Sequence, residues 1–159
     1  MPLVEANGLR LDCEVHGAAD APVVLLIMGL GMPAALWPDQ VVQALTGAGF
    51  RVVTFDNRDA GGSTRLEGVP VPNVLRAIGR ALLRRTVSAP YTLEDMAADT
   101  VGLLDALGIR QAHVVGASMG GMIGQVIAAK YPSRVLSLTS IMSNSGNPDR
   151  KLAFGRWKA

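Results

Sequence analysis

Residues 112–121 read Ala112-His113-Val114-Val115-Gly116-Ala117-Ser118-Met119-Gly120-Gly121. The first four are typical of a short strand, and residues 122–130 predict a helix that ends near Pro132. Glycines at 116 and 120 allow the strand and the helix to approach closely. A strand-to-helix turn this tight forces its central residue into a strained backbone conformation and holds the side chain above the sheet. The sequence therefore predicts an exposed hydroxyl at Ser118.

Ser118 is placed for nucleophilic attack. The first amides of a helix have no partner within it, and the helix dipole gives them partial positive charge. The backbone N–H of Met119 is therefore a candidate oxyanion donor, and such donors are worth on the order of 3 kcal/mol in enzymes. We predict that Ser118 attacks a carbonyl carbon in an acyl-transfer reaction. The alternative is a glycine-rich joint in which a buried serine caps the helix.

Strands and helices alternate along the chain. Strands are predicted at residues 9–15, 22–28, 50–55, 112–115 and 135–142, helices at 39–48, 92–107 and 122–130, and a loop at 56–72. The continuous apolar runs are typical of strands covered on both faces. This order predicts an α/β fold with a doubly wound, mostly parallel sheet and flanking helices. Functional loops are expected at the carboxyl ends of its strands.

A second oxyanion donor is expected from the loop after the strand that ends at Met28, with the Leu30 amide as first choice. This loop has a rival interpretation, because residues 29–34 also fit a loose dinucleotide-binding fingerprint and Asp56 follows the next strand. Against that interpretation, Pro33 and Pro38 move the start of the next helix away from the glycines.

Composition restricts the classes of protein to consider. The 159 residues are 49% hydrophobic and 18% charged, which predicts one domain over residues 1–159. No apolar run approaches the roughly 18 residues of a membrane-spanning helix, so no stable membrane insertion is expected. The formal net charge of +2 gives no support for nucleic-acid binding. The first residues lack a secretory signal, which favours a cytoplasmic location, and the lone Cys13 is expected to be a packing residue.

A basic helix is predicted over residues 73–86. It carries four arginines, at positions 76, 80, 84 and 85. They could form a patch for a membrane surface or an anionic ligand. We favour the plainer interpretation, a solvated face of a connecting or lid helix.

Several separate motifs together resemble a known family. They are Gly29-Leu30-Gly31, Trp37-Pro38-Asp39, Phe55-Asp56-Asn57-Arg58-Asp59 with Gly62-Ser63, and the 116–121 segment. The chain resembles bacterial α/β-hydrolases of the aclacinomycin methylesterase-like and proline iminopeptidase-like groups, from about Val4 to Pro148. The resemblance implies that Ser118 is the nucleophile, that Leu30 and Met119 give the oxyanion amides, and that residues 56–59 form a structural turn beside the site. It also implies hydrolysis of carboxylic esters, or in some members N-terminal prolyl amides, without metal or organic cofactor.

The chain departs from that family after the serine. A full member continues for more than a hundred further residues and carries its catalytic acid and histidine there, so this chain looks like the N-terminal part of the fold without the later strands. A serine without a base is a weak nucleophile. His16 and His113 both precede Ser118, and neither is expected to be the base. Asp99 and Asp149 could be proposed as acids on composition alone.

The predicted strand at residues 135–142 has no later strand in the sequence to pair with. An apolar open edge promotes association. We therefore expect a homo-oligomer, formed through this strand or through the tail at residues 152–157.

Three functional hypotheses follow. The first is a serine hydrolase acting on a small carboxylic ester, with a proline iminopeptidase-like peptidase as a variant. The second is a catalytically impaired remnant or binding protein that retains the pocket. The third is a dinucleotide-binding oxidoreductase.

Overall fold

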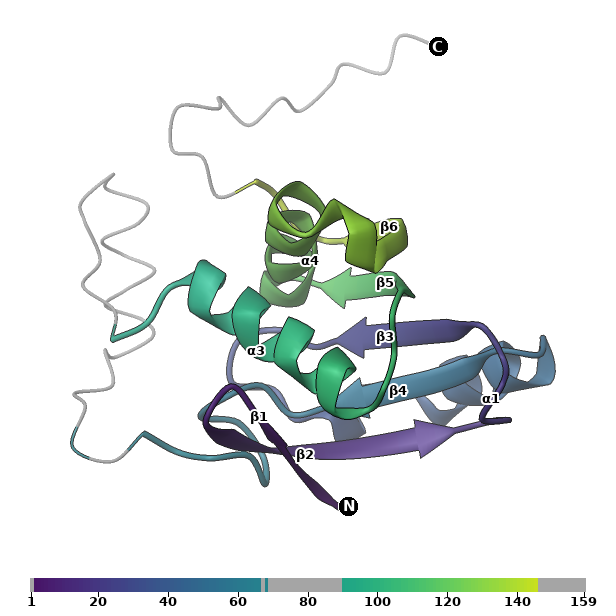
Figure 1. Ribbon diagram of the computed structural model, residues 1–159, viewed down its shortest axis with the longest axis horizontal. Coiled ribbons are helices and arrows are strands. Elements are labelled where there is room, and N and C mark those ends of the chain that lie inside the picture. The colour runs from purple at the N-terminus through teal and green to yellow at the C-terminus, as the bar shows by residue number, and fades with distance from the viewer. Residues whose placement is uncertain (1, 67, 69–89, 146–159) are drawn as a thin grey trace, which may run out of the picture.

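The computed structural model describes residues 2–66, 68 and 90–145 as a six-stranded sheet with helices on both faces (Figure 1). The strands are β1 (Leu3–Ala6), β2 (Leu9–His16), β3 (Val23–Ile27), β4 (Arg51–Phe55), β5 (Ala112–Ala117) and β6 (Val135–Ile141). The helices are α1 (Asp39–Gly47), α3 (Leu93–Ala106) and α4 (Met119–Lys130), with 3-10 turns η1 (Ala34–Leu36) and η2 (Pro132–Arg134). No helix in this part of the chain is both long and apolar enough to cross a membrane.

The sheet has the order β1-β2-β4-β3-β5-β6. The four strands from β4 to β6 are parallel, whereas β1 and β2 pair antiparallel with each other and β2 pairs antiparallel with β4. All five residues of the central strand β3 are buried, as expected for an apolar strand covered on both faces. The predicted α/β fold with a mostly parallel sheet is confirmed.

Two apolar clusters fix the helices to the sheet. The larger lies on the face covered by α3 and α4, and includes Leu103, Leu104, Ile123 and Ile127. The smaller lies under α1 and includes Val24, Leu26, Val52 and Trp37. The sequence predicted helices at residues 39–48, 92–107 and 122–130, and all three are present.

Two elements differ from the sequence predictions. Strand β1 was not predicted, since its four residues are too few to show a pattern. Helix α4 begins at Met119, not Met122, because the turn after β5 passes directly into helix. The predicted helix at residues 73–86 and the tail at residues 152–157 lie outside the described residues.

Strand β6 is an edge strand of the described sheet. It pairs with β5, and among the described residues it has no second partner strand. Leu136 and Ile141 on this strand are exposed. The predicted open apolar edge is therefore present in the described part of the chain.

A buried ion pair joins the turn after β4 to helix α3. Arg58 donates to both carboxylate oxygens of Asp99, from Nε at 2.6 Å and from Nη2 at 2.7 Å. Asn7, at the tip of the β1–β2 hairpin, donates to Asp99 Oδ1 at 2.8 Å. Burial alone would lower the pKa of Arg58, but the hydrogen bonds and charge of Asp99 outweigh burial and raise it. Asp99 is thus a structural partner of Arg58, which leaves no support for a role as catalytic acid.

Removing either member of this pair should destabilise the fold. The Arg58 and Asp99 side chains are only 10% and 3% exposed, so each single change leaves a buried charge without its partner. Arg58→Ala or Asp99→Ala should lower the free energy of unfolding by about 3 kcal/mol. The double variant Arg58→Met/Asp99→Leu should lose much less than the sum of the single losses. Urea denaturation measures all three, and strictly additive losses would show that the pair is not coupled.

Cys13 is buried in β2 and packs in the larger apolar cluster, as predicted. Burial, and then the charges of Asp12 and Glu14, raise the pKa of its thiol to about 11.

The thiol should therefore be inert in the folded protein. The reactive form is the thiolate, which is scarce well below pH 11. We expect iodoacetamide to label Cys13 at pH 8 only after denaturation, as read by intact mass. Rapid labelling of the native chain at pH 8 would contradict the assigned environment.

Candidate active site

Ser118 lies at the joint between β5 and α4. Its backbone has φ 53° and ψ −120°, a region that costs a residue other than glycine roughly 1–3 kcal/mol. The residue is exposed, and its side chain makes no capping hydrogen bond to the helix. Its own N–H donates to the Ile141 carbonyl at 2.8 Å, and its carbonyl accepts from the Gly121 amide at 3.0 Å. The alternative of a buried, helix-capping serine is wrong, and the predicted strained turn with an outward hydroxyl is present.

Two glycines make this turn possible. A Cβ atom at Gly116 would overlap the Gly120 carbonyl group, and a Cβ atom at Gly120 would overlap the Ile27 carbonyl group. No side chain fits at either position without moving backbone. The first turn of α4 therefore packs directly on the end of β3, where the predicted oxyanion loop begins.

The loop from Gly29 to Pro33 borders Ser118. A Cβ atom built on the buried Gly29 would lie 3.4 Å from Ser118 Cβ, so the backbone of the loop lies beside the serine. The loop is closed by a hydrogen bond from the Met32 amide to the Gly29 carbonyl at 3.3 Å, and Leu30 is 53% exposed at its tip. The structure thus brings Leu30 and Ser118 to the same end of the sheet.

Met119 is the first residue of α4. Amides in the first turn of a helix lack an intrahelical acceptor, so this position suits a donor to a bound oxyanion. The roles of Leu30 and Met119 as oxyanion donors stay predictions, which the arrangement of the loop and the helix permits.

The turn after β4 holds the loop beside Ser118. The Ala34 amide donates to Asp56 Oδ1 at 2.6 Å, and Asn57 Nδ2 donates to the Met28 carbonyl at 3.1 Å. Both side chains are buried, at 4% and 3% exposure. The family resemblance predicted a structural turn beside the site at residues 56–59, but no pattern in the sequence indicated these two contacts.

The dinucleotide interpretation is contradicted at two points. Helix α1 begins at Asp39, well after the glycines, so its first amides do not lie at the fingerprint, where they would have to bind the pyrophosphate of a dinucleotide. Both carboxylate oxygens of Asp56 accept backbone amides, from Ala34 and Gly62, and the side chain is buried. Asp56 is therefore not available to a ribose hydroxyl.

The two histidines have other partners. His113 Nδ1 lies 2.8 Å from Ser137 Oγ, and the His113 ring makes an edge contact with Phe50. His16 Nε2 lies 3.3 Å from Glu14 Oε2. Neither contact involves Ser118, in agreement with the expectation that neither histidine is its base.

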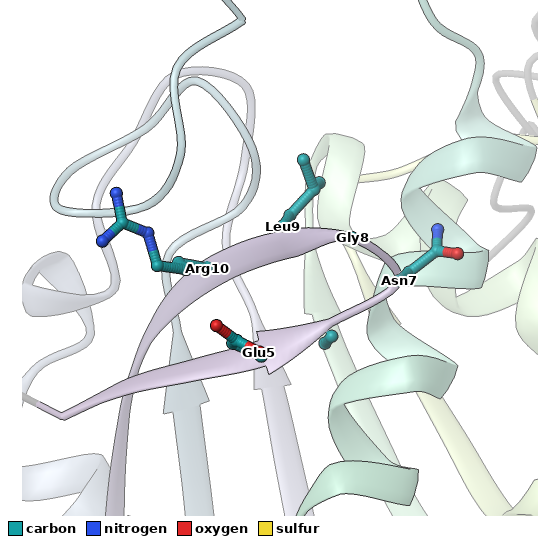
Figure 2. A pocket seen from close by; sticks show the side chains of 6 residues that line it. Glu5, Asn7, Gly8, Leu9 and Arg10 are labelled. Atoms are coloured by element: carbon teal, nitrogen blue, oxygen red, sulfur yellow. The ribbon is translucent and has the colours of Figure 1, made fainter.

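Two cavities lie elsewhere on the sheet. One, of about 280 Å³, is lined by residues 5–10 of the β1–β2 hairpin. Figure 2 shows the side chains there pointing in different directions, with Asn7 turned toward α3 and Arg10 away from it. The other, of about 270 Å³, lies between β2 and α1 and includes Trp37. Neither cavity is lined by Ser118, and in the described ranges no group of three or more His, Cys, Asp or Glu side chains could hold a metal ion.

Known proteins that are similar in sequence and known proteins that are similar in structure belong to the same fold family. The model of the alpha/beta hydrolase fold family matches residues 22–158. Rhodomycin D methylesterase of Streptomyces peucetius is 37% identical over 131 residues, which are 82% of this chain and 38% of that protein. The enol-lactonase of Burkholderia xenovorans LB400 superposes with a TM-score of 0.69 at 29% identity, over 89% of this chain and 46% of that one. A hydrolase from Pseudomonas aeruginosa superposes with a TM-score of 0.66 at 34% identity, over 86% and 43%.

The chain spans less than half the length of each of these relatives. The matched part contains the strained serine turn, the loop after β3 and the turn after β4. On this evidence the chain belongs to the α/β-hydrolase fold family.

Proposed function

We propose that this chain carries the nucleophile and the oxyanion site of a hydrolase acting on carboxylic esters. One observation supports this above the others: an exposed serine with strained backbone lies beside the backbone of the loop after β3. Two relatives are named as a methylesterase and an enol-lactonase, both of which cleave an ester bond. Their names support ester hydrolysis more than hydrolysis of N-terminal prolyl amides.

In the proposed reaction, Ser118 Oγ forms a bond to the ester carbonyl carbon and gives up its proton. The carbonyl oxygen becomes an oxyanion, which accepts hydrogen bonds from the Leu30 and Met119 amides. Collapse of this intermediate breaks the bond to the alcohol oxygen, which leaves with a proton. Water then attacks the acyl-serine, releases the carboxylic acid and restores the hydroxyl.

The Ser118 hydroxyl needs a group that accepts its proton. The contacts of both histidines are with residues other than Ser118, so we propose water or a histidine of another copy as the acceptor for this chain by itself. The same observation favours the second candidate function, a catalytically impaired protein that keeps the serine turn. With water as acceptor the rate is modest, because a serine without a base is a weak nucleophile.

The substitution Ser118→Ala separates these candidates. The wild-type chain should hydrolyse p-nitrophenyl acetate above the rate in buffer, and Ser118→Ala should lower that rate to the buffer value, because the attacking oxygen is absent. Ser137→Ala is a matched control, since this serine contacts His113 and lies outside the turn. It should retain the wild-type rate. Equal rates for wild type and Ser118→Ala would end the esterase proposal.

We also propose that copies of the chain associate through β6, because this edge carries no charged residue and exposes Leu136 and Ile141. Two identical uncharged edges can meet without like-charge repulsion.

Sedimentation at micromolar concentration tests the association. The wild type should sediment as a dimer or larger species, and Leu136→Lys should shift it to monomer, because a charge at the edge opposes pairing. Leu3→Lys, which places the same charge on an exposed residue of β1 at the opposite edge, is the control. A monomeric wild type would contradict the proposal.

A further inference from the structure

The loop from Gly29 to Pro33 is fixed at both ends by two consecutive side chains. At its start, the Met28 carbonyl accepts from Asn57 Nδ2 at 3.1 Å. At its end, the Ala34 amide donates to Asp56 Oδ1 at 2.6 Å. Both hydrogen bonds are buried, and buried bonds of this kind are costly to break because the freed group is left without a partner.

The two side chains are themselves held in place. Asp56 Oδ2 accepts from the Gly62 amide at 2.8 Å, and the Asp56 carbonyl accepts from Ser63 Oγ at 2.6 Å. Ser63 Oγ also accepts from the Asp12 amide in β2 at 2.9 Å. At Gly61, with φ 49°, a Cβ atom would overlap the Asp56 carboxylate. The turn is thus a rigid support anchored on β2.

The same part of the loop touches the serine turn. A Cβ atom at Gly120 would lie 2.8 Å from the Met28 carbonyl oxygen, the atom that Asn57 binds. Gly29, the next residue, lies beside Ser118. A shift of the Met28 peptide would therefore change the distance between the loop amides and the serine.

We infer that Asp56 and Asn57 are positioning residues, which hold the amide of Leu30 at the distance from Ser118 that the oxyanion requires. This inference rests on the proposed esterase function and adds to it the residues that set the oxyanion geometry. Neither side chain contacts the reacting atoms, since both are buried beneath the loop. Their effect is transmitted through the two ends of the loop.

The test compares Asn57→Ala with Thr64→Ala. Both remove a polar side chain from the segment after β4, but only Asn57 contacts the loop, whereas Thr64 Oγ1 contacts the backbone of Arg10. Asn57→Ala should lower kcat for p-nitrophenyl acetate by about ten- to a hundredfold, the effect of a displaced oxyanion donor, with little change in KM. Thr64→Ala should keep kcat within a small factor of wild type. Asn57→Leu, which keeps the branched shape of the side chain and removes the donor, replaces Asn57→Ala if that variant does not fold.

Hydrogen exchange gives a readout that does not depend on turnover. The amides of residues 29–34 should exchange faster in Asn57→Ala than in Thr64→Ala, with exchange in α3 and β3 unchanged. If wild type and Ser118→Ala have equal esterase rates, the proposed function fails and exchange alone decides this inference. Unchanged exchange of the loop in Asn57→Ala, or an equal loss of kcat in both turn variants, would overturn it.

Discussion

The close contact between the first turn of α4 and the end of β3 is the constraint on which the site depends. A side chain at position 120 would overlap the Ile27 carbonyl, so only glycine allows the helix to pack this closely against β3. The helix begins directly after Ser118, and the chain therefore turns within one residue. That turn forces the positive φ of the serine and leaves its side chain exposed. The strain, of roughly 1–3 kcal/mol, is tolerated because the sheet and helix on either side are well packed.

The parallel arrangement of the central strands brings the remaining parts of the site together. Strands β4, β3 and β5 are neighbours, and their carboxyl ends carry the Asp56 turn, the Gly29 loop and Ser118. Residues far apart in the sequence thus meet at one edge of the sheet, as expected for an open α/β fold. The antiparallel β1 and β2 contribute support: Asn7 binds Asp99, and Asp12 binds Ser63.

Much of this could be predicted from the sequence, and the failures have physical reasons. The glycines on both sides of Ser118 and the apolar strand that ends at Met28 are strong local signals. The serine turn and the α/β class could therefore be predicted. The contacts of Asp56 and Asn57 join residues more than twenty positions apart and depend on strand order, which periodicity does not encode. The ion pair of Arg58 with Asp99, 41 positions away, was missed for the same reason, and Asp99 was left as a candidate acid.

The central claim is that the Ser118 hydroxyl is the attacking group. Acylation by p-nitrophenyl acetate expels a good leaving group, whereas removal of the acetyl group from Ser118 requires attack by water, so an acyl-enzyme should accumulate. Mass spectrometry of the chain after reaction with p-nitrophenyl acetate and acid quench tests this directly. The account predicts one acetyl group on the peptide that contains Ser118. An unmodified Ser118, with acetyl groups only on lysines or the N-terminus, would contradict it.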